Sequence, residues 1–389
     1  MIPQSSVVNS FKLYFSNSIR WTFLVAILTG TVYYLVFDFL RWNQYDSASY
    51  EAGARLLFGL EGGADLQGRM SKPLALVFPG LCEIAFGINA RYGFLIQSGI
   101  CYVLLVFLWK GILKNLEFSE DLQKMGILML VMSQPFAVFS FGILADFPGW
   151  CCMLWLIYIY TQRSLSFRWL WVVAVTFIGL LVKESIFVGI VFVVISEFFN
   201  TSIRKISALR YVLLFGVIFV ITQILIYYLN FDGLVNRQRE IRNWGGVFEI
   251  QNTSQILQIW RAFEGIWWFF LTPIVFYQKK LFLDSLFSKT TLSLIFSVSL
   301  MPFVHPAFLV DRVLFMFFPL VFLSLLTLLN QPYVSKWGWF IVLSGSLSVV
   351  YTWLTYKFSL SGLFPYYFAL SLIIPLIIII SKWKENEIG

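Results

Sequence analysis

Carboxylate side chains stand at a few places between long apolar runs of this 389-residue chain, often beside basic residues. Asp46 follows the first apolar run, Asp146 lies close to the start of a later run, and Lys183-Glu184 separates two short runs. A carboxylate can act as a general base toward a hydroxyl, and a cation can stabilise the charge of a departing phosphate. These residue types therefore suit a reaction in which a hydroxyl attacks and an anion leaves.

Each carboxylate also has a structural interpretation. Asp46 stands where a surface helix would begin, and Asp is a favoured N-cap residue. Asp146 precedes Pro148, and proline is favoured in the first turn of a helix. From the residues alone, Asp46 is either a catalytic base or a cap. Asp146 is either a cap or a residue that holds the acceptor, a divalent metal or a cation.

The basic candidates leave two interpretations open as well. Arg69 and Lys72 follow Asp46 in the same polar stretch, where they can bind a lipid phosphate or extend toward lipid headgroups. Lys183-Glu184 is a charged pair at membrane depth, which predicts a functional site by default. Its alternatives are an outer turn and a structural ion pair.

The composition indicates which kind of element positions these residues. Hydrophobic residues make up 59% of the chain and charged residues 12%, whereas a soluble domain carries about 25% charged residues. A lipid bilayer tolerates this balance. The net charge of +8 is scattered between the apolar runs and forms no patch, so we expect membrane lipids and no nucleic acid as partners.

The apolar runs predict an all-α, polytopic membrane protein with about twelve transmembrane helices, because a spanning helix needs about 20 residues. We interpret residues 1–389 as a single transmembrane domain without internal repeats. The predicted spans are Trp21–Leu40, Tyr92–Leu113, Met125–Ile143, Pro148–Tyr160, Trp169–Val182, Ile186–Phe199, Leu209–Leu229, Ala262–Phe276, Thr291–Val304, Val313–Leu329, Trp337–Tyr356 and Leu363–Ile380.

The distribution of basic residues predicts the orientation. Most of them fall on one side if both termini are cytoplasmic and if Pro73–Gly87, which is too short to span, stays on one side as a half-inserted helix. The two long loops, residues 41–91 and 230–261, then lie outside. The sequence shows no signal-peptide cleavage site and no endoplasmic-reticulum retention motif, so we expect a bacterial plasma (inner) membrane.

The first outside loop begins with a predicted juxtamembrane helix. Tyr50, Ala54, Leu57 and Phe58 recur at helical amphipathic spacing, and glycines at 59, 62 and 63 end the pattern. Such a helix lies on the membrane surface and places Asp46 at its start.

The order of these features resembles that of the C-type glycosyltransferases (GT-C), and most closely the bacterial aminoarabinose–lipid A transferases and protein O-mannosyltransferases. The resemblance covers roughly residues 1–200 as a GT-C-like core, plus residues 305–319 within the C-terminal helices at 262–381. It departs in having Asp46-Ser47 in place of Asp-Glu and a lone Asp146 in place of Asp-x-Asp. The residues that carry the resemblance are Asp46, Tyr50, Lys72-Pro73, Phe86-Gly87, Arg91, Ala145-Asp146, Lys183-Glu184, His305, Arg312 and Phe318-Pro319.

The resemblance implies a glycosyltransferase with an outward-facing active site and a polyprenyl-phosphate sugar donor. The acceptor would be a glycan, a lipid or a protein. No cofactor is certain, and Asp146 is the possible ligand if a divalent metal takes part. Asp46 and Asp146 are the expected catalytic residues, and the expected substrate-binding residues are Tyr50, Arg69, Lys72, Lys183, His305 and Arg312.

Other functions fit the same pattern of spans and loops. A transporter or flippase of lipid-linked glycans fits twelve spans, although such proteins usually contain repeats. A catalytically silent scaffold subunit would keep the fold without the chemistry. A polymerase or ligase of lipid-diphosphate glycans would share the outward site and its basic residues.

Overall fold

The computed structural model describes residues 4–37, 46–60, 69–162, 165–199, 205–229, 288–304, 315–330 and 338–358. Within these ranges all regular structure is helical, with thirteen α-helices and two short 3₁₀-helices. The all-α class predicted from the apolar runs is therefore confirmed for this part of the chain. The loop at 230–261 and the predicted spans at 262–276 and 363–380 lie outside the described residues.

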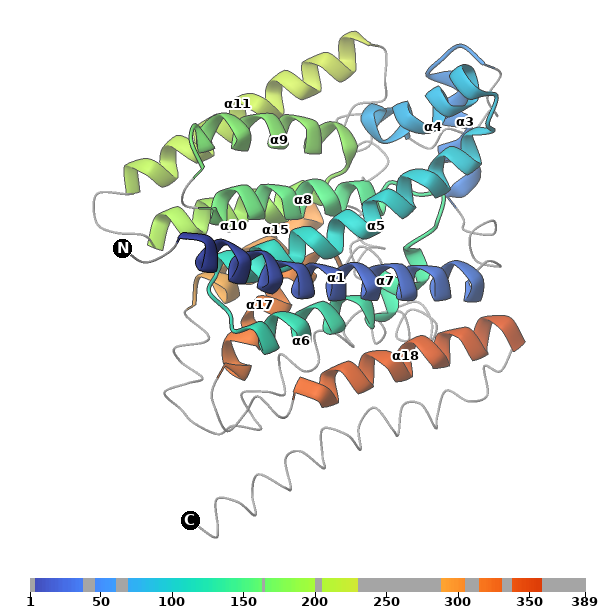
Figure 1. The fold of residues 1–389 in the computed structure, drawn as a ribbon. Helices are drawn as coiled ribbons and strands as arrows, with labels where there is room; N and C mark the ends of the chain where they lie inside the picture. Colours follow the sequence, from blue (N-terminus) through green and yellow to red (C-terminus); the bar gives the residue numbers. More distant parts are fainter. Residues whose placement is uncertain are drawn as a thin grey trace.

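Most of the long helices lie side by side, and α3 and α4 sit at one end of the array beside the start of α5 (Figure 1). The elements are α1 (Gln4–Val36), α3 (Ser47–Leu56), η1 (Arg69–Ser71), α4 (Pro73–Phe86), α5 (Ala90–Asn115), α6 (Glu120–Val131), α7 (Gln134–Phe139), α8 (Asp146–Thr161), α9 (Arg168–Val182), α10 (Ile186–Phe199), α11 (Lys205–Tyr228), α15 (Lys289–Val304), η3 (Phe315–Phe317), α17 (Phe318–Leu329) and α18 (Gly338–Phe358).

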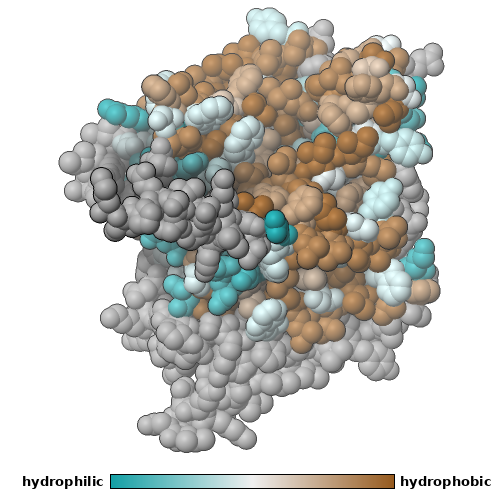
Figure 2. Space-filling model, in the orientation of Figure 1, coloured by the Kyte–Doolittle hydropathy of each residue, from teal (hydrophilic) through white to brown (hydrophobic). Residues whose placement is uncertain are grey.

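Three helical segments in the described part of the chain are long and apolar enough to cross a membrane. They are Ser18–Val36, Ala90–Asn115 and Ser207–Tyr228. Much of α11 is exposed and apolar, as at Leu213 and Val217, and Figure 2 shows apolar atoms over most of the described surface on its visible face. An apolar exterior over long helices suits a lipid environment.

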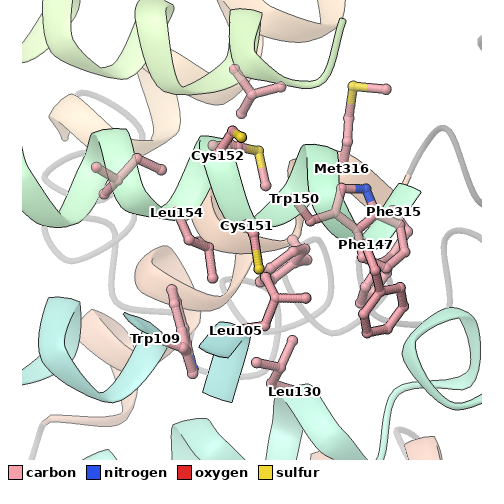
Figure 3. Close-up of a cluster of buried hydrophobic side chains, with 14 of the residues drawn as sticks. Leu105, Trp109, Leu130, Phe147, Trp150, Cys151, Cys152, Leu154, Phe315 and Met316 are labelled. Atoms are coloured by element: carbon pink, nitrogen blue, oxygen red, sulfur yellow. The ribbon is translucent and has the colours of Figure 1, made fainter. Parts of the chain in front are cut away.

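Helix α8 occupies the centre of the array. Its side chains are buried on nearly every side, and a helix that is apolar all round belongs in the interior. Trp150 packs edge-on against Phe315, with ring centroids 5.1 Å apart, and Phe147 lies beside it at 5.0 Å (Figure 3). This aromatic core fixes α8, and hence Asp146 at its first residue, against its neighbours.

The predicted span Met125–Ile143 is wrong as a single helix. The chain forms α6 and then the short α7, with Ser133 in an extended conformation between them. Pro135 explains the break, because proline has no N–H to donate and its ring collides with the preceding turn of a continuing helix. It is accepted instead in the first turn of α7.

Both helices predicted in the first outside loop are present. In α3, Tyr50 and Ala54 are buried, as the amphipathic spacing predicts. Helix α4 ends at Phe86, and its C-cap residue Gly87 has a φ of +66°, which suits glycine. The two helices touch at Gly80, where an added Cβ would lie 2.6 Å from the Ala54 carbonyl oxygen. Helix α3 is thereby held close to α4, and Asp46 at its start is held with it.

Candidate functional site

The connection between α9 and α10 brings charged side chains to one end of the helix array. Helix α9 ends at Val182, and Lys183 adopts an extended backbone conformation. Glu184 and Ser185 follow in a turn that leads into α10. Lys183 and Glu184 reach different partners, and they do not pair with each other.

Lys183 forms a buried ion pair with Asp146, the first residue of α8. The side chains are 4% and 1% exposed, so both charged groups are buried away from water. Asp146 does not cap α8, because Ala145 occupies the cap position and no side-chain cap hydrogen bond forms there. The cap interpretation of Asp146 is therefore wrong, and its carboxylate is directed at a cation.

Lys72 forms the second buried pair, with Glu184. Its Nζ lies 3.1 Å from Oε1 and 3.0 Å from Oε2 of that carboxylate, and the side chains are 3% and 6% exposed. Lys72 immediately precedes α4, where Pro73 opens the helix. The pair therefore links the first outside loop to the α9–α10 connection, 112 residues away along the chain.

Gly149 makes room for this arrangement. It lies one turn after Asp146 on α8, and an added Cβ would stand 2.6 Å from Cβ of Lys183 and 2.7 Å from Oγ of Ser185. Real Cβ atoms essentially never approach so closely. The absence of a side chain thus lets the stem of Lys183 lie against α8 and reach Asp146.

The two pairs together place four charges with no net charge in the interior. Removing ions from water costs several kcal/mol for each ion, and their mutual attraction often fails to offset that cost. A buried ion pair is therefore weak evidence for stability, whereas charge at membrane depth is typical of a functional site. We take the two pairs as the centre of the candidate site.

Asp46 stands in the N-cap position of α3 with a side chain that is 5% exposed, yet it forms no cap hydrogen bond with the helix. The predicted N-cap position of Asp46 is therefore confirmed, whereas the side-chain hydrogen bond of a cap is not formed. Helix α3 contacts η1, which leads directly into Lys72. Asp46 is therefore buried near the segment that carries Lys72.

Two ion pairs fix the helix that carries Asp46. Arg55 of α3 lies 3.1 Å from Oε1 of Glu83 in α4, and Glu51 of α3 receives two hydrogen bonds from Arg91 of α5, at 3.2 and 2.9 Å. Glu83 also accepts a hydrogen bond from the backbone N–H of Ala90. These contacts tie α3 to two neighbours, so Asp46 has a defined position.

A small pocket opens at the Lys72–Glu184 pair. It has room for about one water molecule. Polar side chains of Ser71 and Gln223 lie beside the pair, and apolar side chains complete the wall. The lining residues are Ser71, Lys72, Leu180, Glu184, Phe187, Gln223 and Ile226. The pocket thus combines a charged end with an apolar wall that includes the membrane-length helix α11.

The remaining predicted site residues are placed as follows. Tyr50 is buried, with its ring 6.1 Å from that of Phe94. Arg69 begins η1, and only its backbone is described. His305 and Arg312 lie outside the described residues. Among the residues that are described, no group of three or more His, Cys, Asp or Glu side chains is arranged to hold a metal ion.

Some residues of the site are absent from the sequence-based set. Ser71 and Gln223 line the pocket, and Gly149 and Ser185 surround Lys183. The sequence could have indicated Gly149, since this glycine follows Asp146 by one helical turn inside an apolar run. Gln223 is a polar residue within an apolar span, which also marks it. Nothing in the sequence pattern distinguishes Ser71 and Ser185 from other serines.

Comparison of the chain with protein-family models, with curated proteins and with solved structures finds no match.

The close packing at Gly149 gives a first prediction. Gly149→Ala is expected to push the Lys183–Ser185 segment away from α8 and to lower stability by about 1–3 kcal/mol, the usual cost of overpacking. Thermal unfolding of the purified protein in detergent measures this. The matched control is Gly216→Ala in α11, where an added Cβ meets no atom within 4 Å. Equal unfolding temperatures for the two variants would contradict the packing described.

Proposed function

We propose that the protein is a membrane glycosyltransferase that moves a sugar from a polyprenyl-phosphate donor to an acceptor on the non-cytosolic side of a bacterial plasma (inner) membrane. The observation that carries this proposal is the buried Lys72–Glu184 pair, which lies at a pocket with an apolar wall at the end of the array near Asp46. A lipid phosphate has a charged head and an apolar tail, for which Lys72 and the apolar wall are the matching groups.

The topology in this proposal has about twelve spans with both termini cytoplasmic, and the first long loop outside. Three membrane-length helical segments support it. The ion pairs also support it, because they join residues that the topology places on one side. Lys72, Asp146, Lys183 and Glu184 all fall at the outer ends of the predicted spans or in the outer loop.

The reaction assigns a role to each part of the site. The acceptor hydroxyl oxygen attacks the anomeric carbon of the sugar while Asp46 takes its proton. The bond between that carbon and the phosphate oxygen breaks, and its electron pair leaves with the polyprenyl phosphate. In a direct displacement the base lies on the face opposite the leaving group. Lys72 and Lys183 are the described cations that can stabilise the phosphate.

The remaining predicted residues complete this assignment. Asp146 holds Lys183 in place and can contact the acceptor. Arg69, His305 and Arg312 supply further contacts to the phosphate and sugar, and Tyr50 supports the start of α3. The acceptor is a glycan, a lipid or a protein. The choice among these depends on surfaces beyond the buried pairs.

A reconstituted assay tests the proposal. Purified protein in detergent is mixed with a radiolabelled polyprenyl-phosphate sugar and candidate acceptors, and product is separated by chromatography. A transferase makes product without a sealed membrane, whereas a flippase moves its substrate only between leaflets of a vesicle. If the lipid-linked sugar crosses the vesicle membrane but no product forms in detergent, the transferase assignment is wrong. A scaffold subunit would do neither.

A labelling experiment tests the topology. Single cysteines introduced at positions 46 and 146, in a background without the four native cysteines, are expected to react with a membrane-impermeant maleimide from the same, non-cytosolic side. Both positions are buried in the folded protein, so labelling follows brief detergent-free denaturation of sealed vesicles with urea. A label that enters from opposite sides at the two positions would rule out a shared pocket.

A further inference from the structure

The Lys72–Glu184 pair fills the place where an anionic ligand would meet its cation. Both carboxylate oxygens of Glu184 lie within 3.1 Å of Nζ of Lys72. Lys72 is the cation among the residues that line the pocket, and the free space beside it holds about one water molecule. A phosphate group is larger than a water molecule and cannot contact Nζ while Glu184 keeps this position.

The repulsion between two anions also argues against a phosphate on Lys72 while Glu184 keeps its position. A phosphate bound to Nζ of Lys72 would lie next to the carboxylate of Glu184, and like charges at contact distance repel strongly away from water. The ammonium group has three N–H donors. A ligand phosphate therefore competes with Glu184 both for those donors and for room beside them.

We infer that Glu184 stands in for the phosphate of the ligand in the unoccupied site, and that binding exchanges one anion on Lys72 for the other. This inference rests on the proposed function, which supplies a phosphate-bearing ligand. Glu184 is then a positioning residue: it pairs with the buried Lys72 and orders it between turnovers, and its return helps to displace the polyprenyl phosphate after transfer.

The exchange predicts that the carboxylate of Glu184 weakens the binding of a ligand phosphate to Lys72. Glu184→Gln keeps a side chain of the same shape that accepts a hydrogen bond from Lys72, and it removes the competing charge. We expect the full-length protein in detergent to bind farnesyl phosphate about tenfold or more tightly when it carries this substitution. Isothermal titration calorimetry measures the Kd. Farnesol, which has the same tail without the phosphate, is expected to bind both proteins equally.

Glu197→Gln is the matched control. Glu197 lies on α10, as close to its end as Glu184 is to its start, and its side chain is equally buried. Its carboxylate accepts hydrogen bonds from Tyr160 at 3.0 Å and Ser207 at 2.9 Å and faces no lysine of the pocket. This substitution also removes one buried carboxylate, and it is expected to leave the Kd for farnesyl phosphate unchanged.

The outcomes separate this inference from the proposed function. If the wild-type protein binds farnesyl phosphate and Glu184→Gln binds it equally or more weakly, the exchange is wrong and the transferase proposal stands. If neither protein binds it, both are overturned. Should Glu184→Gln fail to fold, Glu184→Asp retains the charge but draws it back from Nζ, and it is expected to tighten binding to a smaller extent. Weaker binding by that variant would overturn the exchange.

Discussion

Replacing Asp46 with asparagine is expected to lower the rate of sugar transfer about 10²- to 10⁴-fold, the factor that a positioned general base contributes. Asparagine has nearly the same shape as aspartate but cannot take a proton from the acceptor hydroxyl. The unfolding temperature of the variant is measured beside the rate, so that a loss of transfer through misfolding is recognised. The radiolabelled transfer assay measures the rate.

Glu51→Gln is the control for that variant, because Glu51 lies on α3, the helix that Asp46 directly precedes. Its partner Arg91 is 45% exposed, and an exposed ion pair contributes at most about 1 kcal/mol. We expect transfer by Glu51→Gln to fall by less than about tenfold, since that energy corresponds to a smaller factor. Equal losses in the two variants would show that Asp46 acts by holding α3 in place and not as a base.

The local part of the fold could be predicted from the sequence. The spacing of Tyr50 and Ala54 predicted the buried face of α3, and the short run before Gly87 predicted α4. These predictions depend on residues within a few turns of one another. The break before α7 was also local, but we missed it because the long apolar run hid the effect of Pro135.

The pairing of the charges could not be predicted in this way. Lys72 and Glu184 are separated by 112 residues, and Asp146 and Lys183 by 37. The sequence drew attention to all four as charged residues between apolar runs, yet it favoured no particular partner for any of them. The change from the extended backbone of Lys183 to the turn at Glu184 and Ser185 lets these two side chains reach different partners. The absence of a side chain at Gly149 lets Lys183 lie close against α8.

The Asp146–Lys183 pair gives the largest expected effect on stability. Lys183→Met removes the cation and leaves the carboxylate of Asp146, which is 1% exposed, without its ion-pair partner. Breaking a buried pair in this way costs about 3–5 kcal/mol. We therefore expect a marked fall in the unfolding temperature of the purified protein in detergent. Lys124→Met is the control, since its partner Glu120 is 41% exposed and a pair of this kind contributes about 0.3–0.5 kcal/mol.

The double variant Asp146→Leu with Lys183→Met separates stability from function. Replacing a whole buried pair by apolar side chains of similar size is often neutral or stabilising, so the double variant is expected to unfold at or above the wild-type temperature. Because it lacks a cation that the proposed reaction uses, it is nevertheless expected to lose transfer. A double variant that regains both stability and transfer would mean that this pair is a structural element. The phosphate would then have to be stabilised by Lys72 and by cations elsewhere in the chain.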